Sequence, residues 1–193
     1  MNWGFSLSPV WVLIIINFLF FFAALISRRV LFNMALIPAD FLDRPWTLFT
    51  AMFMHSTTDF WHIMFNMIAL YFFGRTLTML VNEGKFLLVY FIGGIVGNVL
   101  FLLLNLSSYS LLIGASGAVY AVAGALVVMV PNMRIMFWGL IPMPLWVFVI
   151  VFLGLLSLPP FVSVGVAWQA HMGGLVTGLV AGYFFRKRGR YYR

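Results

Sequence analysis

The chain has 193 residues, of which 64% are hydrophobic, 19% aromatic and only 8% charged. Soluble domains carry about 25% charged residues, so this composition excludes a polar-surfaced protein and predicts an integral membrane protein. The sequence contains no cysteine, which excludes disulfides, a thiolate nucleophile and a thiolate metal site. The net charge of +7 is concentrated after the last apolar block. That position is typical of a cytoplasmic flank beside anionic membrane lipid and does not favour nucleic acid as a partner.

Six apolar blocks predict an all-α bundle of six transmembrane helices in a single domain, residues 1–193. The predicted helices cover about 9–26, 61–80, 85–105, 116–130, 145–158 and 167–185. No lysine or arginine precedes the first block, so we interpret it as a retained helix and not a signal peptide. The stretch from about 30 to 60 is rich in Leu, Phe, Met and Trp. We expect it to be a long non-helical first loop at the membrane interface.

Basic residues predict the orientation of the bundle in the cell membrane. With the loops assigned alternately, eight lysines and arginines lie on the side of the C-terminal tail and three on the other. This bias predicts that both termini are cytoplasmic. The fourth block, 15 residues from Ser116 to Val130, spans about 22 Å as a helix, less than the hydrocarbon core of about 30 Å. We therefore expect Ser116 below the outer surface, in a polar pocket that opens toward the outer face.

Few polar side chains lie inside the apolar blocks. Ser116 begins the fourth block, with Gly114 and Gly117 close on either side. On the second block His62 and Asn66 are four residues apart, so they share one helix face. Because polar groups are costly inside a membrane, these residues are candidates for a functional site.

A stripe of small residues continues along the sixth block from His171. The stripe is Gly174, Gly178 and Gly182, and the fourth block carries a matching stripe of Gly117, Ala121 and Gly124. Such stripes let two membrane helices approach closely. Pairing the fourth helix with the sixth along them would bring His171 to the depth of Ser116.

A neutral imidazole can take the proton of a serine hydroxyl and make it a nucleophile. No aspartate or glutamate lies in a predicted span, so an acidic third member is not available there. Tyr120, four residues after Ser116, is placed to pack against His171. Suitable oxyanion donors are the side chains of His62 and Asn66 and the backbone N–H of Ser116 at a helix N-terminus.

These motifs together resemble the rhomboid family of intramembrane serine proteases, in its minimal six-helix form. The likeness covers nearly the whole chain and implies Ser116 as nucleophile, His171 as general base and no cofactor or metal. It also implies an oxyanion hole of His62, Asn66 and the Ser116 N–H, with Tyr120 supporting the base. Its implied substrates are transmembrane proteins, which enter between the second and fifth helices, beside a cap formed by residues 159–166. His55 resembles the family's upstream histidine, which braces the first loop.

The chain departs from the family pattern at two places in the first loop. Family members commonly carry a Trp-Arg pair, where this chain has Trp46 followed by Thr47, with Arg44 two residues earlier. His55 and His62 are separated by seven positions where five is usual, which indicates a two-residue insertion around 57–58.

Other functions fit the sequence less well. A metal site from His55, His62 and His171 would have no acidic or thiolate partner in the spans. A transporter or channel is disfavoured because the spans lack acidic residues and no inverted repeat is evident. Taken singly, glycines beside a membrane serine more often serve helix packing. A catalytically inactive relative that binds membrane helices stays open as the alternative.

Overall fold

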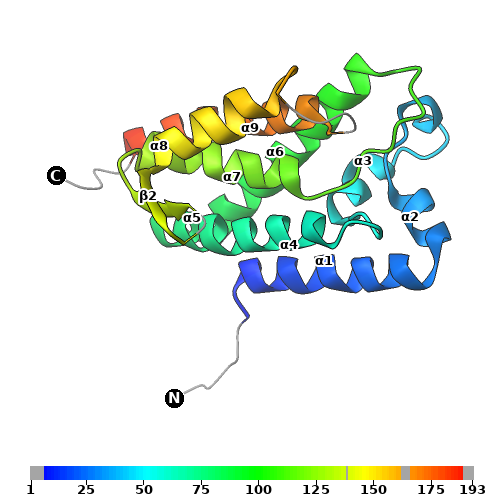
Figure 1. Cartoon of the computed structure of the whole chain (residues 1–193), viewed down its shortest axis with the longest axis horizontal. Coiled ribbons are helices and arrows are strands. Elements are labelled where there is room, and N and C mark those ends of the chain that lie inside the picture. The colour runs from blue at the N-terminus through cyan, green and yellow to red at the C-terminus, as the bar shows by residue number, and fades with distance from the viewer. Residues whose placement is uncertain (1–6, 138, 162–165, 189–193) are drawn as a thin grey trace.

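The computed structural model describes residues 7–137, 139–161 and 166–188, and these are mostly α-helical. Among these residues, three helical segments are long and apolar enough to cross a membrane, namely Pro9–Ile26, Phe60–Val81 and Glu83–Leu104. The first is α1, the second combines α4 (Phe60–Ala69), a π-helical turn (Leu70–Gly74) and α5 (Arg75–Val81), and the third is α6. The chain is therefore a multi-pass membrane protein, and Figure 1 shows α1, α4, α7 and α9 running roughly parallel.

The remaining membrane-like segments are shorter or less apolar. Helix α7 (Ser116–Met129) has 14 residues, close to the predicted 116–130. The predicted fifth helix is α8 (Leu145–Val147) followed by a π-helical segment (Phe148–Gly154) and a 3₁₀ turn (Leu155–Ser157). Helix α9 (Trp168–Arg188) matches the predicted sixth helix, but its histidine, glutamine and glycines make it less apolar than the three long spans.

Two expectations about the connections were wrong. The 30–60 stretch is not a non-helical loop, because it contains α2 (Arg28–Met34), α3 (Thr47–Thr50) and 3₁₀ turns at Pro38–Asp40 and Ala51–Phe53. Some of its apolar side chains, among them Met52 and Met54, are buried against the bundle, whereas others, such as Leu42, are exposed. The fold is also not purely α-helical, because β1 (Arg134–Phe137) and β2 (Ile141–Pro144) form an antiparallel hairpin between α7 and α8. Gly139, in the connection between the two strands, has the positive φ that a tight hairpin turn requires. The paired strands give each other's backbone N–H and C=O groups hydrogen-bond partners, which an irregular loop would not.

The centre of the bundle is a three-helix core of α6, α7 and α9 packed backbone against backbone. A methyl group added at Gly174 would lie 2.0 Å from the Gly117 carbonyl oxygen, and one at Gly178 would lie 1.9 Å from that of Ala121. Glycine is required at both places because real Cβ atoms cannot approach so closely. The close contact predicted between the two small-residue stripes is therefore present.

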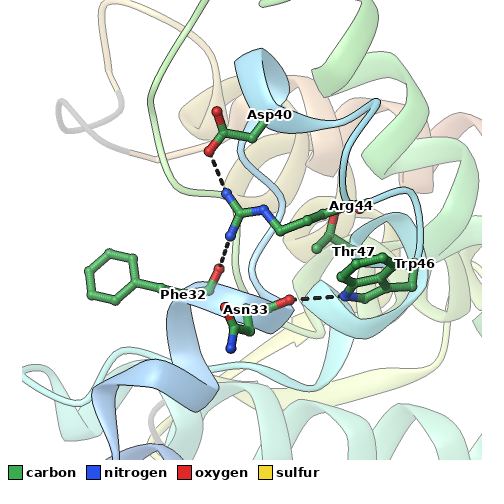
Figure 2. Close-up of polar contacts among 6 residues, drawn as sticks. All are labelled: Phe32, Asn33, Asp40, Arg44, Trp46 and Thr47. Atoms are coloured by element: carbon green, nitrogen blue, oxygen red, sulfur yellow. Dashed lines mark hydrogen bonds and ion pairs between the residues drawn. The ribbon is translucent and has the colours of Figure 1, made fainter.

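Side chains of the first loop satisfy the carbonyls at the end of α2, which have no partner within their own helix. Arg44 donates to the Phe32 carbonyl oxygen and pairs with the Asp40 carboxylate, and Trp46 Nε1 donates to the Asn33 carbonyl oxygen (Figure 2). Arg44 and Trp46, which are not adjacent in this chain, thus both anchor the C-terminal end of α2.

Long-range hydrogen bonds fasten the first loop to the segment that precedes α7. Leu36 and Leu112 exchange two backbone hydrogen bonds, and the Gly114 N–H donates to the Ala51 carbonyl oxygen at 3.0 Å. The buried Asn98 of α6 donates its amide to the Leu48 carbonyl oxygen at 2.8 Å. These bonds hold the backbone before Ser116 in one position relative to the core.

Candidate active site

The N-terminal ends of α7 and α9 bring Ser116 and His171 together. Ser116 is the first residue of α7 and His171 lies in the first turn of α9. Their Oγ and Nε2 atoms are 2.9 Å apart, which is hydrogen-bond distance, although 55 residues separate them in the sequence. The contact follows from the core packing, since Gly174 is one turn beyond His171 and rests on the Gly117 backbone.

The His171 ring is held by stacking rather than by a carboxylate. Its centroid lies 4.2 Å from that of the Tyr120 ring, with only 17° between the two planes. Among the residues that the structure describes, no hydrogen-bond partner faces His171 Nδ1, which is buried. A flat aromatic surface therefore sets the ring's plane and leaves Nε2 directed at Ser116.

The hydroxyl of Tyr120 is itself hydrogen-bonded to Ser157 at 2.7 Å. Ser157 ends the 3₁₀ turn after the π-helical segment and is buried, with 6% of its surface exposed. This bond joins the residue that supports His171 to the 145–157 segment. Sequence reasoning missed Ser157, because a single serine near two prolines gave no sign of a partner 37 residues away.

His62 faces Ser116 across a small gap beside Gly114. Gly114 has φ of 125°, in the region that favours glycine. A Cβ added there would lie 2.9 Å from His62 Nε2 and 3.6 Å from Ser116 Oγ. The missing side chain thus leaves room between a ring nitrogen and the serine oxygen, where a small polar atom of a substrate could be received.

The other two expected oxyanion donors are the Asn66 side chain and the Ser116 backbone N–H. Asn66 is buried and donates its amide Nδ2 to the His62 carbonyl oxygen at 2.8 Å, so one N–H is used within α4. A carboxamide nitrogen carries a second N–H, which keeps donor capacity. The Ser116 N–H is at the first position of α7, where an amide has no intrahelical acceptor.

His55 packs against His62 and is fully buried. The two ring centroids are 5.2 Å apart. Burial, with a smaller contribution from His62, lowers the pKa of His55 to about 3, against a weak opposing effect of the Phe53 carbonyl. His55 is therefore neutral at physiological pH and packs under His62 without adding a charge. Neither of its ring nitrogens is hydrogen-bonded within the described part of the chain.

The three histidines do not form a metal cluster. No group of three His, Asp or Glu side chains within residues 7–137, 139–161 and 166–188 is close enough to hold a metal ion. The predicted cap at 159–166 falls partly outside the described residues, because 162–165 are not among them.

Known proteins resemble this chain in sequence. The family model described as the Rhomboid domain matches residues 42–188. The chain therefore belongs to the rhomboid family. It is 27% identical over 172 residues to the mitochondrial Rhomboid protein 1 of Saccharomyces cerevisiae, which covers 82% of this chain and 47% of the relative. It is 32% identical over 136 residues to Rhomboid protease GluP of Bacillus subtilis, covering 70% of this chain and 25% of that protein.

A plant relative extends the likeness beyond bacteria and yeast. RHOMBOID-like protein 1 of Arabidopsis thaliana is 29% identical over 147 residues, which cover 76% of this chain and 36% of the relative. The chain thus spans about half or less of the length of these three curated relatives. The Rhomboid domain match, residues 42–188, includes the segments that carry Ser116 and His171.

Proposed function

We propose that this protein is an intramembrane serine endopeptidase that acts through a dyad of Ser116 and His171. The observation that carries the proposal is the 2.9 Å contact between Ser116 Oγ and His171 Nε2 inside a matched Rhomboid domain. A related bacterial protein bears the name rhomboid protease, which agrees with this activity.

In the proposed mechanism Ser116 Oγ attacks the carbonyl carbon of the scissile peptide bond while His171 Nε2 accepts its proton. The tetrahedral intermediate collapses as the imidazolium returns that proton to the leaving amine. Water, deprotonated by the same nitrogen, then hydrolyses the acyl-enzyme and restores Ser116. Stacking on Tyr120 keeps the imidazole plane fixed while it gains and loses the proton.

The oxyanion of the intermediate would occupy the space beside Gly114. His62 Nε2, the Asn66 amide and the Ser116 N–H are its donors in this proposal. The space exists because residue 114 has no Cβ, whose position would be 2.9 Å from His62 Nε2. Donors aimed at the place where charge develops contribute about 3 kcal/mol each to lowering such a barrier.

The substrates we propose are transmembrane proteins cut in or near a membrane helix that unwinds readily. A helical peptide bond is sterically hidden, so the substrate must present extended backbone to Ser116. Lateral entry past the 145–157 segment fits the six-span topology with both termini cytoplasmic and the site open toward the outer face. The protein would need no metal or other cofactor and would work in contact with membrane lipid.

The test is cleavage of a single-span substrate by the purified protein in lipid vesicles. Ser116→Ala and His171→Ala should each lower the rate by at least about 10³-fold, because neither half of a dyad works alone. A chelator should leave the wild-type rate unchanged. Covalent labelling of wild-type protein, but not of Ser116→Ala, by a fluorophosphonate would support the assignment of the nucleophile.

The alternative, an inactive relative that binds membrane helices, predicts a different result. It would bind the single-span substrate without cutting it, and the fluorophosphonate would not label Ser116. Wild-type cleavage that survives either substitution would contradict the dyad.

A further inference from the structure

Residues 56–59, between His55 and His62, form a closed turn at the start of α4. The Ser56 Oγ accepts hydrogen bonds from the Thr58 N–H at 3.3 Å and the Asp59 N–H at 3.0 Å. Asp59 is the N-cap of α4, and its Oδ1 accepts from the Trp61 N–H at 3.0 Å. One serine side chain therefore closes the turn that leads into the helix carrying His62.

The backbone of the same serine contacts the ring of His62. The Ser56 N–H donates to His62 Nδ1 at 3.3 Å. A nitrogen that accepts a hydrogen bond carries a lone pair, so in the neutral ring the proton must be on the other nitrogen, Nε2. Nε2 is the atom that faces the space beside Gly114 and Ser116.

The tautomer decides whether His62 can serve as an oxyanion donor. With the proton on Nε2, the ring presents an N–H to the gap. With the proton on Nδ1, it would present a lone pair there and repel a negative oxygen. An imidazolium would also direct an Nδ1–H at the Ser56 N–H, so the turn opposes both other forms of the ring.

Nothing else in the described part of the chain is bonded to His62 Nδ1. The neighbouring His55 packs against the ring without a hydrogen bond from either nitrogen. We propose that Ser56 is a positioning residue, whose N–H, held by the turn over residues 56–59, fixes His62 in the Nε2-protonated tautomer that the oxyanion hole requires. The inference rests on the proposed function and gives the turn over residues 56–59 a role in it.

The direct test is nitrogen NMR of protein labelled with ¹⁵N-histidine. The chain contains only three histidines, so His55→Leu and His171→Ala suffice to assign the signals. We expect His62 in the wild-type protein to be Nε2-protonated. An Nδ1-protonated His62 in the wild-type protein would overturn the inference without any variant at position 56.

Substitutions at Ser56 test the mechanism. Ser56→Pro removes the N–H, and we expect a mixture of His62 tautomers and a fall in kcat of about tenfold with KM unchanged. Ser56→Thr keeps the N–H and a hydroxyl, so the His62 tautomer and kcat should both stay as in the wild-type protein. Thr57→Ala, in the same turn, is the matched control and should change neither. An unaltered His62 tautomer in folded Ser56→Pro would contradict the role of the turn.

A second set of variants separates this inference from the proposed function. In a His62→Ala background, Ser56→Pro should cause no further loss of kcat, whereas a further tenfold loss would show that Ser56 acts elsewhere. A chain that cuts no substrate but holds Nε2-protonated His62 supports the tautomer assignment and counts against the proteolytic function. Proteolysis by a chain with Nδ1-protonated His62 overturns the tautomer assignment and leaves the proteolytic function standing.

Discussion

The α6–α7–α9 core and the 145–157 segment both contact the side chain of Tyr120 and are built in different ways. In the core, glycines bring backbones into contact, and residues 117–127 of α7 are buried except for Tyr120. In the 145–157 segment the helix is mostly π-helical, follows Pro144, and has the exposed side chains Trp146, Ile150 and Leu155. The core cannot move without separating backbones. Among the described residues, the 145–157 segment is tied to the bundle by backbone hydrogen bonds only at its start, where Leu145 and Trp146 donate to Met133 and Pro131, and side-chain contacts hold the rest.

This difference suits the proposed reaction. Ser116 and His171 both belong to the core, so their 2.9 Å contact depends on the close backbone packing of α7 and α9. The segment that a substrate would have to pass is held to its surroundings by contacts such as Phe73 with Phe148, at 6.0 Å between ring centroids. The proposed reaction would need a rigid pair of Ser116 and His171 and a movable side wall.

The largest effect should come from a methyl group placed in the core. Gly178→Ala puts a Cβ 1.9 Å from the Ala121 carbonyl oxygen, so α7 and α9 must separate. We expect a loss of more than about 3 kcal/mol in the free energy of unfolding, since overpacking between backbones cannot be relieved by rotamer changes. Thermal unfolding in detergent measures this loss, and cleavage should disappear with it.

Gly154→Ala is the matched control in the 145–157 segment. Its added Cβ would lie 3.5 Å from the Val149 carbonyl oxygen, an ordinary contact distance. Stability should change by less than about 1 kcal/mol. Equal losses in the two variants would remove the distinction between a rigid core and a movable segment.

Locking the 145–157 segment should have the next largest effect. Because the sequence contains no cysteine, Phe73→Cys with Phe148→Cys introduces a single pair that a short bifunctional thiol reagent can join. Joined protein should cut a transmembrane substrate at least about tenfold more slowly, since the substrate's path is closed. Fluorophosphonate labelling of Ser116 should persist in the joined protein. Full cleavage by it would contradict entry past this segment.

A third prediction concerns the pH dependence of stability and His55, which lies in the first loop, outside both regions. Because the pKa of His55 is lowered to about 3 from an ordinary value near 6.5, the unfolded chain binds a proton there that the folded chain does not. The free energy of unfolding should thus fall as pH drops from 6.5 toward 3, by about 2 kcal/mol at pH 5. Denaturant unfolding at pH 7 and pH 5 measures the fall, which His55→Leu should reduce.

The smallest effect should come from the bond between the two regions. Tyr120→Phe keeps the ring that stacks on His171 but removes the hydroxyl that meets Ser157 at 2.7 Å. We expect a loss of about 1 kcal/mol in stability, the usual net value of one hydrogen bond. Ser157→Ala should match it, and the double variant should lose no more than either single one. Additive losses, read from the same unfolding experiment, would show that the two hydroxyls act separately.

The spacing of residues along single helices explains which parts of the fold and of the candidate site could be predicted from the sequence. Small residues at helical spacing below His171 and after Ser116 mark faces of single helices, and pairing the faces brings the two side chains together. The bounds of α1, Pro9–Ile26, were predicted correctly because an uninterrupted apolar run leaves little choice. The hairpin of β1 and β2 was missed, since the Arg134–Phe137 strand is too short for an alternating pattern to stand out.

The sequence by itself determined that this is a membrane protein of the rhomboid family, and its spacing indicated that Ser116 and His171 should meet. Those conclusions depend on composition and on residues three or four apart, which any helix places on one face. Only the tertiary structure decided that Ser157 reaches Tyr120, that Arg44 closes the end of α2, and that Ser56 donates to His62. Each of these bonds has one partner in a turn or loop and the other in a helix, and no repeating pattern along the chain records such a contact.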